Sequence, residues 1–101
     1  PRSVLEAMAI GRAVITTDVP GCRETIVGVG AENPDGVRIG INGMLIRARS
    51  VNSLVAAIKI ARSNPEMIKK MGIEGARIAR ERFDVRIVNR IIMDLLGLQV
   101  T

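Results

Sequence analysis

The chain has 101 residues, of which 48% are hydrophobic and one, Phe83, is aromatic, so it supports at most one domain with an aliphatic core. A net charge of +5 favours anionic partners such as nucleotides, phosphates, acidic lipid surfaces or nucleic acid. The single Cys22 and the lack of histidine exclude an internal disulfide, a Cys–His nucleophile and a histidine-based metal site within these residues.

The chain opens on a pattern that is typical of a helix start. Ser3 and Glu6 have the spacing of a capping box, which predicts a helix to about Ile10 with Gly11 as its C-terminal stop. The short apolar run Ala13–Thr17 is rich in β-branched residues and predicts a strand that is buried on both faces. The order helix then strand indicates an α/β protein.

Turn residues dominate the next part of the chain. The sequence predicts a loop over Asp18–Gly21, with Pro20 placed at a helix start, and a short helix over Arg23–Val27. Gly28–Gly36 is rich in Gly, Asn, Pro and Asp, so we expect a loop there.

A small hairpin is expected next. Val37–Ile41 can form a strand, Asn42-Gly43 is a strong hairpin-turn dipeptide, and Met44–Arg47 is the expected returning strand.

Three helices are predicted in the remainder. Ser50 is expected to cap the first, Asn64 followed by Pro65 to start the second, and Asp84 to cap the third. Apolar spacing predicts a buried stripe on the first helix, formed by Val51, Leu54, Val55, Ile58 and Ala61. The stripe predicted for the third helix consists of Val85, Val88, Ile91, Ile92 and Leu95.

Three segments carry a resemblance to a known family. They are PRSVLEAMAIGR from Pro1, ITTDVPGCRET from Ile15 and ERFDVRIVN from Glu81. The chain resembles the C-terminal, donor-binding half of a GT4-like retaining glycosyltransferase of GT-B architecture. It is most similar to bacterial enzymes that build lipid-linked glycans and surface polysaccharides. The resemblance implies a partial Rossmann-like fold with parallel strands, and it is weakest between Val27 and Ile41.

The same resemblance implies which residues bind the donor. Glu6 matches the second glutamate of the family's E-x7-E motif, which accepts hydrogen bonds from ribose hydroxyls, and a carboxylate can accept two at once. The amides of Arg2, Ser3 and Val4 lie where the family meets the diphosphate, at a helix start that suits an anion. The alternative is that Ser3 and Glu6 only cap the helix, and both roles can hold in different states.

The family's first glutamate, its basic diphosphate ligands and its acceptor domain would all precede Pro1. We therefore expect residues 1–101 to be a single partial domain, the C-terminal portion of a longer enzyme, with no catalytic residue of its own and no activity alone. Gly21 and Glu24 match a G-x-x-E step of the family. We interpret Glu24 as a solvated acid at a helix start, or as an ion-pair partner of Arg23 or Arg12.

The function implied is transfer of a sugar, with retention, from a nucleotide-diphosphate donor such as a UDP-sugar to a lipid-linked or glycan acceptor. Family members generally need no metal or cofactor, and we expect a cytoplasmic location, including the inner face of the cytoplasmic membrane. If the third helix crosses toward an absent N-terminal domain, its Val85–Leu95 face would be exposed and promote self-association.

Two other classes of function compete with this reading. One is a non-catalytic Rossmann-like module for binding or assembly, and the other is a small basic domain that binds polyanions. Nucleic acid is not an expected partner, because the chain lacks aromatic platforms or a recognised module. The basic residues between Glu66 and Arg82 alternate with acids at helical spacing, as in the pair Arg77–Glu81, which is typical of a solvated helix face.

Overall fold

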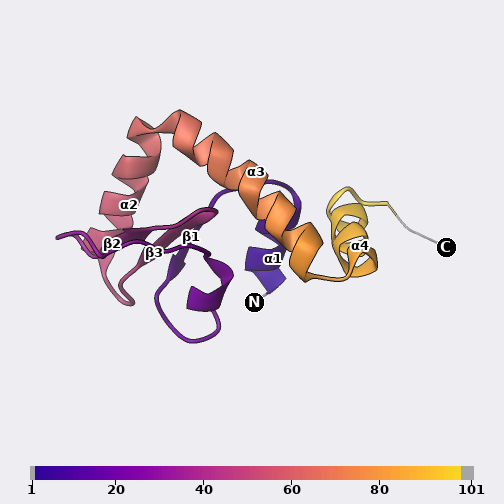
Figure 1. Ribbon diagram of the computed structural model, residues 1–101, viewed down its shortest axis with the longest axis horizontal. Helices are drawn as coiled ribbons and strands as arrows, with labels where there is room; N and C mark the ends of the chain where they lie inside the picture. Colours follow the sequence, from indigo (N-terminus) through magenta and orange to yellow (C-terminus); the bar gives the residue numbers. More distant parts are fainter. Residues whose placement is uncertain (1, 99–101) are drawn as a thin grey trace.

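The computed structural model describes residues 2–98 and confirms the α/β class (Figure 1). A three-stranded sheet is combined with four α-helices and one 3-10 helix. In chain order the elements are α1 (Arg2–Ala9), β1 (Val14–Thr17), η1 (Arg23–Thr25), β2 (Val37–Ile39), β3 (Gly43–Ile46), α2 (Val51–Ser63), α3 (Pro65–Arg82) and α4 (Val85–Leu95).

The sheet is mixed, with strand order β1-β3-β2. β1 pairs with β3 in parallel, with Val14 opposite Gly43, and β2 pairs with β3 antiparallel, with Val37 opposite Ile46. The predicted parallel pairing and the predicted hairpin are therefore both present. A parallel pair of strands needs a long connection, which here contains η1 and β2 itself.

Asn42 lies in the connection between the strands as predicted, together with Gly40 and Ile41, but Gly43 already belongs to β3 and is not a turn residue. Asn42 is fully buried. Its side-chain amide donates from Nδ2 to the carbonyl of Thr25 and accepts at Oδ1 from the amide of Val27, both at 2.9 Å. The side chain of Asn42 is therefore buried inside the fold, although the residue belongs to the strand connection.

The glycine-rich segment 28–36 is a loop as predicted, and it runs along the outer edge of β2. It continues the antiparallel pattern without being a regular strand. Three backbone hydrogen bonds join the two segments, from Ile41 N to Val27 O at 2.8 Å, from Gly30 N to Ile39 O at 2.9 Å and from Asn33 N to Val37 O at 2.9 Å. The outer edge of β2 is thus covered by the chain itself.

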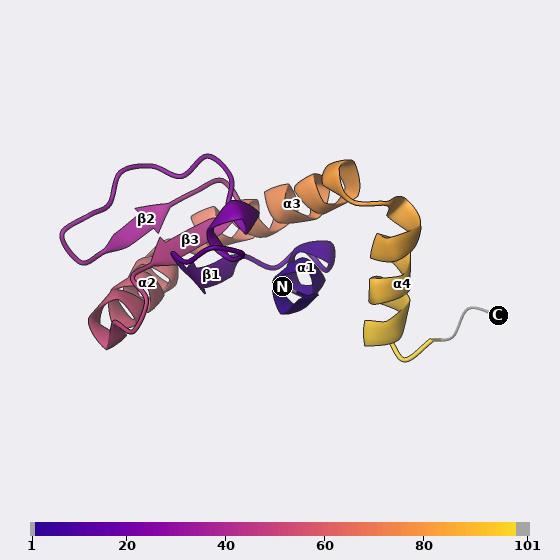
Figure 2. The same cartoon turned by 90° about the horizontal axis from the view of Figure 1, so that it is seen from below.

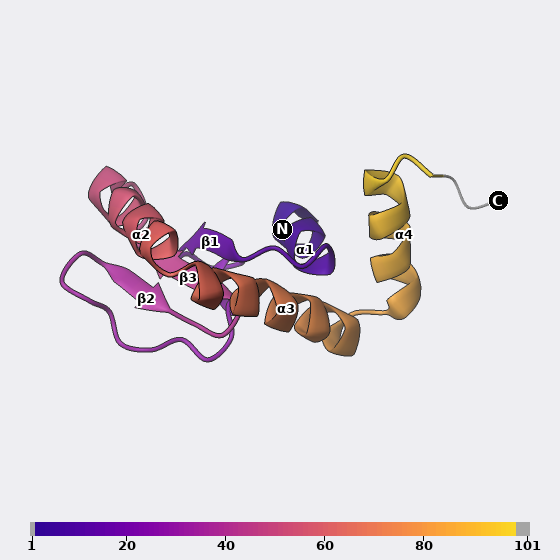
Figure 3. The same ribbon diagram turned by 90° about the horizontal axis from the view of Figure 1, so that it is seen from above.

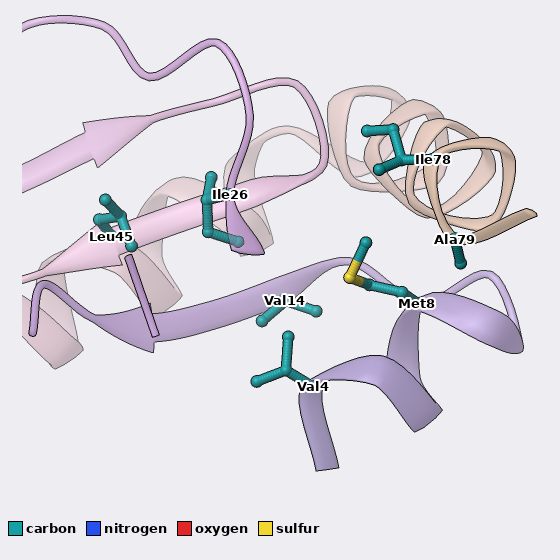
Figure 4. Packing of buried hydrophobic residues seen from close by; sticks show 7 residues of the cluster. All are labelled: Val4, Met8, Val14, Ile26, Leu45, Ile78 and Ala79. Atoms are coloured by element: carbon teal, nitrogen blue, oxygen red, sulfur yellow. The ribbon is translucent and has the colours of Figure 1, made fainter. Parts of the chain in front are cut away.

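Alternating residues of the sheet pack on opposite faces, as the pleat requires. On β3, Met44 and Ile46 belong to a cluster with Ala57 of α2 and Met71 of α3. Leu45 between them belongs to a second cluster on the other side, which includes residues of α1 and α3 (Figure 4). The core is therefore aliphatic, as the composition predicts.

Of the stripe predicted for α2, only Ala61 packs against the core, and the prediction is wrong for the other four residues. Ser50 caps the helix as predicted, accepting from the amide of Ser53 at 3.1 Å, but the buried residues are Ser53 and Ala57. Ser53 Oγ donates to the carbonyl of Asp35 at 2.6 Å, and the small Ala57 permits close approach to the sheet. The four large residues Val51, Leu54, Val55 and Ile58 are consequently exposed.

α3 crosses the molecule and joins the α2 end to the α4 end (Figures 1 and 2). Its contact with the loop before β1 depends on glycine. A Cβ atom at Gly72 would collide with the carbonyl oxygen of Gly11, whereas a Cβ at Gly75 would meet Asn42, Arg12 and Met8 at ordinary distances of 3.6–3.8 Å. Pro65 begins the helix as predicted, but Asn64 does not cap it, because its Nδ2 donates back to the carbonyl of Ile60.

α4 lies at the opposite end of the molecule from α2 (Figure 3). Asp84 caps it as predicted, accepting from the amide of Arg86 at 2.8 Å. Of the predicted stripe, Val88 and Ile91 are buried against Ala9 and Leu5 of α1, whereas Val85 and Leu95 are exposed. α4 packs mainly on α1 and less on α3, and the buried part of its stripe is narrower than the sequence pattern.

Within residues 2–98, no helix combines the length and the apolar character that a membrane-spanning segment requires.

Candidate functional site

The first turn of α1 is held in place by its buried face. Val4 and Met8 are buried, and Figure 4 shows Val4 beside Val14 of β1. α1 runs antiparallel to β1, so the first turn of α1 lies toward the carboxyl end of that strand (Figure 4). Ligands of α/β sheets characteristically bind beyond the carboxyl ends of the parallel strands.

The backbone of this turn offers hydrogen-bond donors. Arg2, Ser3 and Val4 form the first turn of α1 as the structure describes it, and the backbone amides of a first turn can donate to groups outside the helix. Ser3 is exposed, whereas the side chain of Val4 is in the core and only its backbone can serve a ligand. These amides and the positive end of the helix dipole suit a phosphate group.

Glu6 lies on the same side of α1 as Ser3, since residues three apart in a helix are neighbours on its surface. Its side chain is half-buried. The predicted capping box has the wrong register, because a helix that starts at Arg2 places Ser3 inside its first turn and not at the N-cap. The structure thus brings Ser3, Glu6 and the first-turn amides together, with Val4 contributing its backbone.

The G-x-x-E step has a local structural role. The amide of Gly21, a residue at φ +88°, donates to Glu24 Oε2 at 2.7 Å. The suggested ion pair of Glu24 with Arg23 is wrong, because Arg23 binds Asp18 instead, with 3.0 Å between Nε and Oδ1. Glu24 is exposed, so the reading as a solvated acid at a helix start is confirmed.

A cluster of charges at the carboxyl end of β1 was not predicted. Asp18 directly follows β1, and besides Arg23 it has Arg38 of β2 at 3.8 Å. A second pair joins Arg47, just after β3, to Glu32 of the loop at 3.0 Å, and the hydrogen bond from Arg47 lowers the pKa of Glu32. The sequence does show charged residues at the ends of the strands. It does not show that Asp18 pairs with Arg38, because the hairpin brings these two residues together across twenty positions.

A groove of about 970 Å³ lies between α1, η1, α3 and α4, and it was also not predicted. Its apolar lining comes from Leu5, Met8, Ile78, Phe83, Ile87 and Ile91. Three arginines, Arg82, Arg86 and Arg90, line it as well. Ser3, Val4 and Glu6 are not among the residues that line it, so the groove is a separate feature from the predicted donor site at these three residues.

Arg77 of α3 forms ion pairs within the helix. Arg77 contacts Glu74 at 2.8 Å and Glu81 at 2.9 Å, which confirms the predicted Arg77–Glu81 pair and raises the pKa of the guanidinium. Among residues 2–98 no group of three or more Cys, Asp and Glu side chains could hold a metal ion. The chemistry available at α1 is therefore hydrogen bonding by amides and by one carboxylate.

Comparison with known proteins agrees with the fold. A family model described as "Glycosyl transferases group 1" matches residues 1–78, which include α1, the whole sheet and most of α3. A search of curated proteins finds no match to the chain.

Proposed function

The chain belongs to the group 1 glycosyltransferases, and from this premise we propose that α1 binds the nucleotide-diphosphate part of a sugar donor. In this proposal the amides of Arg2, Ser3 and Val4 bind the diphosphate, and Glu6 accepts hydrogen bonds from the ribose hydroxyls. The observation that supports it is the position of Glu6 on the same side of α1 as the exposed Ser3, next to the first-turn amides.

The proposed reaction is transfer of the sugar to an acceptor with retention at the anomeric carbon. As the bond to the sugar breaks, negative charge develops on the leaving diphosphate, and fixed amide dipoles stabilise that charge without reorganising. The proposed donor is a UDP-sugar, and the proposed acceptor is a lipid-linked or growing glycan that another domain binds. The proposed reaction needs no metal or cofactor. The proposed location of the enzyme is the cytoplasm, including the inner face of the cytoplasmic membrane.

The test is the substitution Glu6→Ala in the intact enzyme. A hydrogen bond to a charged group contributes about 1.5–3 kcal/mol, so we expect the donor KM to rise about tenfold to a hundredfold. Glu24→Ala is the matched control, since Glu24 is another carboxylate near a helix start and accepts a hydrogen bond from the amide three residues earlier. It should leave the donor KM unchanged.

The melting temperature separates the two roles of Glu6. If Glu6→Ala leaves the donor KM unchanged and lowers the melting temperature strongly, Glu6 is a structural residue and the donor assignment is wrong. A nucleotide titration followed by NMR adds a second readout at the amides of Arg2 to Glu6. Binding of UDP and free phosphate with the same steep salt dependence would instead favour a polyanion-binding domain.

We also propose that the 101-residue chain self-associates through α4. The supporting observation is the exposure of Val85, Ile87 and Leu95 on a helix that packs mainly against α1. Light scattering at rising concentration measures this directly, and a constant monomer mass would refute it.

A further inference from the structure

The outward face of α2 carries an exposed apolar stripe. Its members recur at intervals of three and four residues, so they lie on one side of the helix. Their exposed fractions are 73% for Val51, 41% for Leu54, 42% for Val55 and 51% for Ile58. The opposite side, with Ser53 and Ala57, already packs on the sheet.

α2 is therefore apolar on two opposite sides, of which only one is covered. A helix with apolar residues all round is normally buried on all sides, and exposed patches of this kind mark interaction surfaces. The figures place α2 at the end of the molecule, with its outer side away from the other helices (Figures 1 and 3). The stripe is thus accessible to a large partner.

Charge distribution identifies the chemistry of that partner. No aspartate or glutamate occurs from Gly36 to Pro65, although this stretch holds five basic residues. Two of them are already paired, Arg38 with Asp18 and Arg47 with Glu32. The other three are Arg49, Lys59 and Arg62, and no carboxylate of residues 2–98 forms an ion pair with them.

We propose that this face of α2 binds the surface of an anionic lipid bilayer. The stripe would enter the boundary between headgroups and acyl chains, and Arg49, Lys59 and Arg62 would contact lipid phosphates. A second copy of the chain is a poorer occupant, because its α2 would bring like charges against these three. The inference deepens the proposed membrane location but is independent of the donor site, so each can fail alone.

Co-sedimentation of the full chain with vesicles tests the proposal. We expect binding to vesicles of phosphatidylcholine with 30% phosphatidylglycerol at 0.1 M salt, and weak binding to pure phosphatidylcholine. One basic residue near such a surface contributes about fivefold in affinity, so the double variant Lys59→Gln, Arg62→Gln should bind about 25-fold more weakly. Leu54→Gln with Ile58→Gln should reduce binding at least as strongly.

The control is Ile73→Gln, since Ile73 is a similarly exposed aliphatic residue on α3. It should change vesicle affinity by less than about twofold, and all variants should keep their melting temperature within a few degrees because the changed side chains are exposed. Equal binding to both kinds of vesicle, or unchanged binding by the two double variants, would overturn the proposal. A concentration-dependent dimer that Leu54→Gln with Ile58→Gln dissociates would assign the face to a second copy instead.

Discussion

Two glycines of α3 should respond in opposite directions to the same substitution. Gly72 and Gly75 both lie inside the helix and are both buried, and alanine is the better helix former by about 0.5–1 kcal/mol at either position. The difference lies in what the added methyl group meets. At Gly72 it collides with the backbone carbonyl of Gly11, and at Gly75 its nearest neighbour is Asn42 Cβ at 3.6 Å.

The magnitudes follow from these contacts. A backbone atom cannot swing aside as a side chain can, so Gly72→Ala must push α3 away from the loop, at the upper end of the 1–3 kcal/mol range for overpacking. After the gain in helix propensity, we expect a net loss of about 2 kcal/mol for Gly72→Ala. Gly75→Ala should raise the free energy of unfolding by about 0.5–1 kcal/mol.

Urea denaturation of both variants beside the parent chain measures these changes. If the m-value is unchanged, the shift of the midpoint reports stability alone, and a 2 kcal/mol loss corresponds to roughly 1 M urea. Equal or higher stability of Gly72→Ala would refute the reasoning, since it would mean that α3 does not approach the loop at Gly11 this closely.

Two further predictions concern polar side chains. Asn42→Ala should lower the free energy of unfolding by about 2 kcal/mol or more, because it leaves the partners at Thr25 and Val27 unbonded, whereas Asn64→Ala at an exposed site should cost less than about 0.5 kcal/mol in the same urea titration. The hydrogen bond from Arg86 and its amide lower the pKa of Asp84, so the stabilisation from this carboxylate is present above its usual pKa of about 3.9 and is lost as the pH falls through the lowered value. Asp84→Asn should therefore flatten the fall of melting temperature below about pH 4, and an unchanged acid limb would contradict this assignment.

The sequence predicted those helix caps and helix starts that depend on residues close together in the chain. The cap at Ser50, the cap at Asp84 and the start of α3 at Pro65 all involve residues within one turn of each other, so the sequence pattern contains the interaction. The strand β1 was equally clear, because its apolar residues are consecutive.

Features that depend on tertiary contacts could not be predicted from the sequence pattern. The buried side of α2 was predicted from its large residues, yet the small Ser53 and Ala57 face the sheet, since a helix can approach a strand more closely through small side chains. Asn42 lies in the strand connection as predicted, but its burial was not predicted, because its partners, Thr25 and Val27, are more than fourteen positions away. The groove between α1, η1, α3 and α4 depends on the relative placement of these elements, so the sequence pattern of any one element does not predict it.

The proposed donor-binding residues were predicted only in part. The position of Ser3 and Glu6 on one side of a helix follows from their spacing, but α1 is helical from Arg2, two residues earlier than a helix capped by Ser3. That small difference moves Ser3 from a capping role into the first turn. It leaves Ser3 exposed beside the amides that we propose for the diphosphate.

The loop that runs along β2 has a consequence for how the sheet can grow. Hydrogen bonds at three points of segment 27–33 occupy the outer side of β2, where a further strand would otherwise add. Within residues 2–98 the other edge strand, β1, keeps one side without a strand neighbour. Extension of the sheet is therefore directional, toward β1 alone, and the side with the charged hairpin is protected from the edge-to-edge association that leads to aggregates.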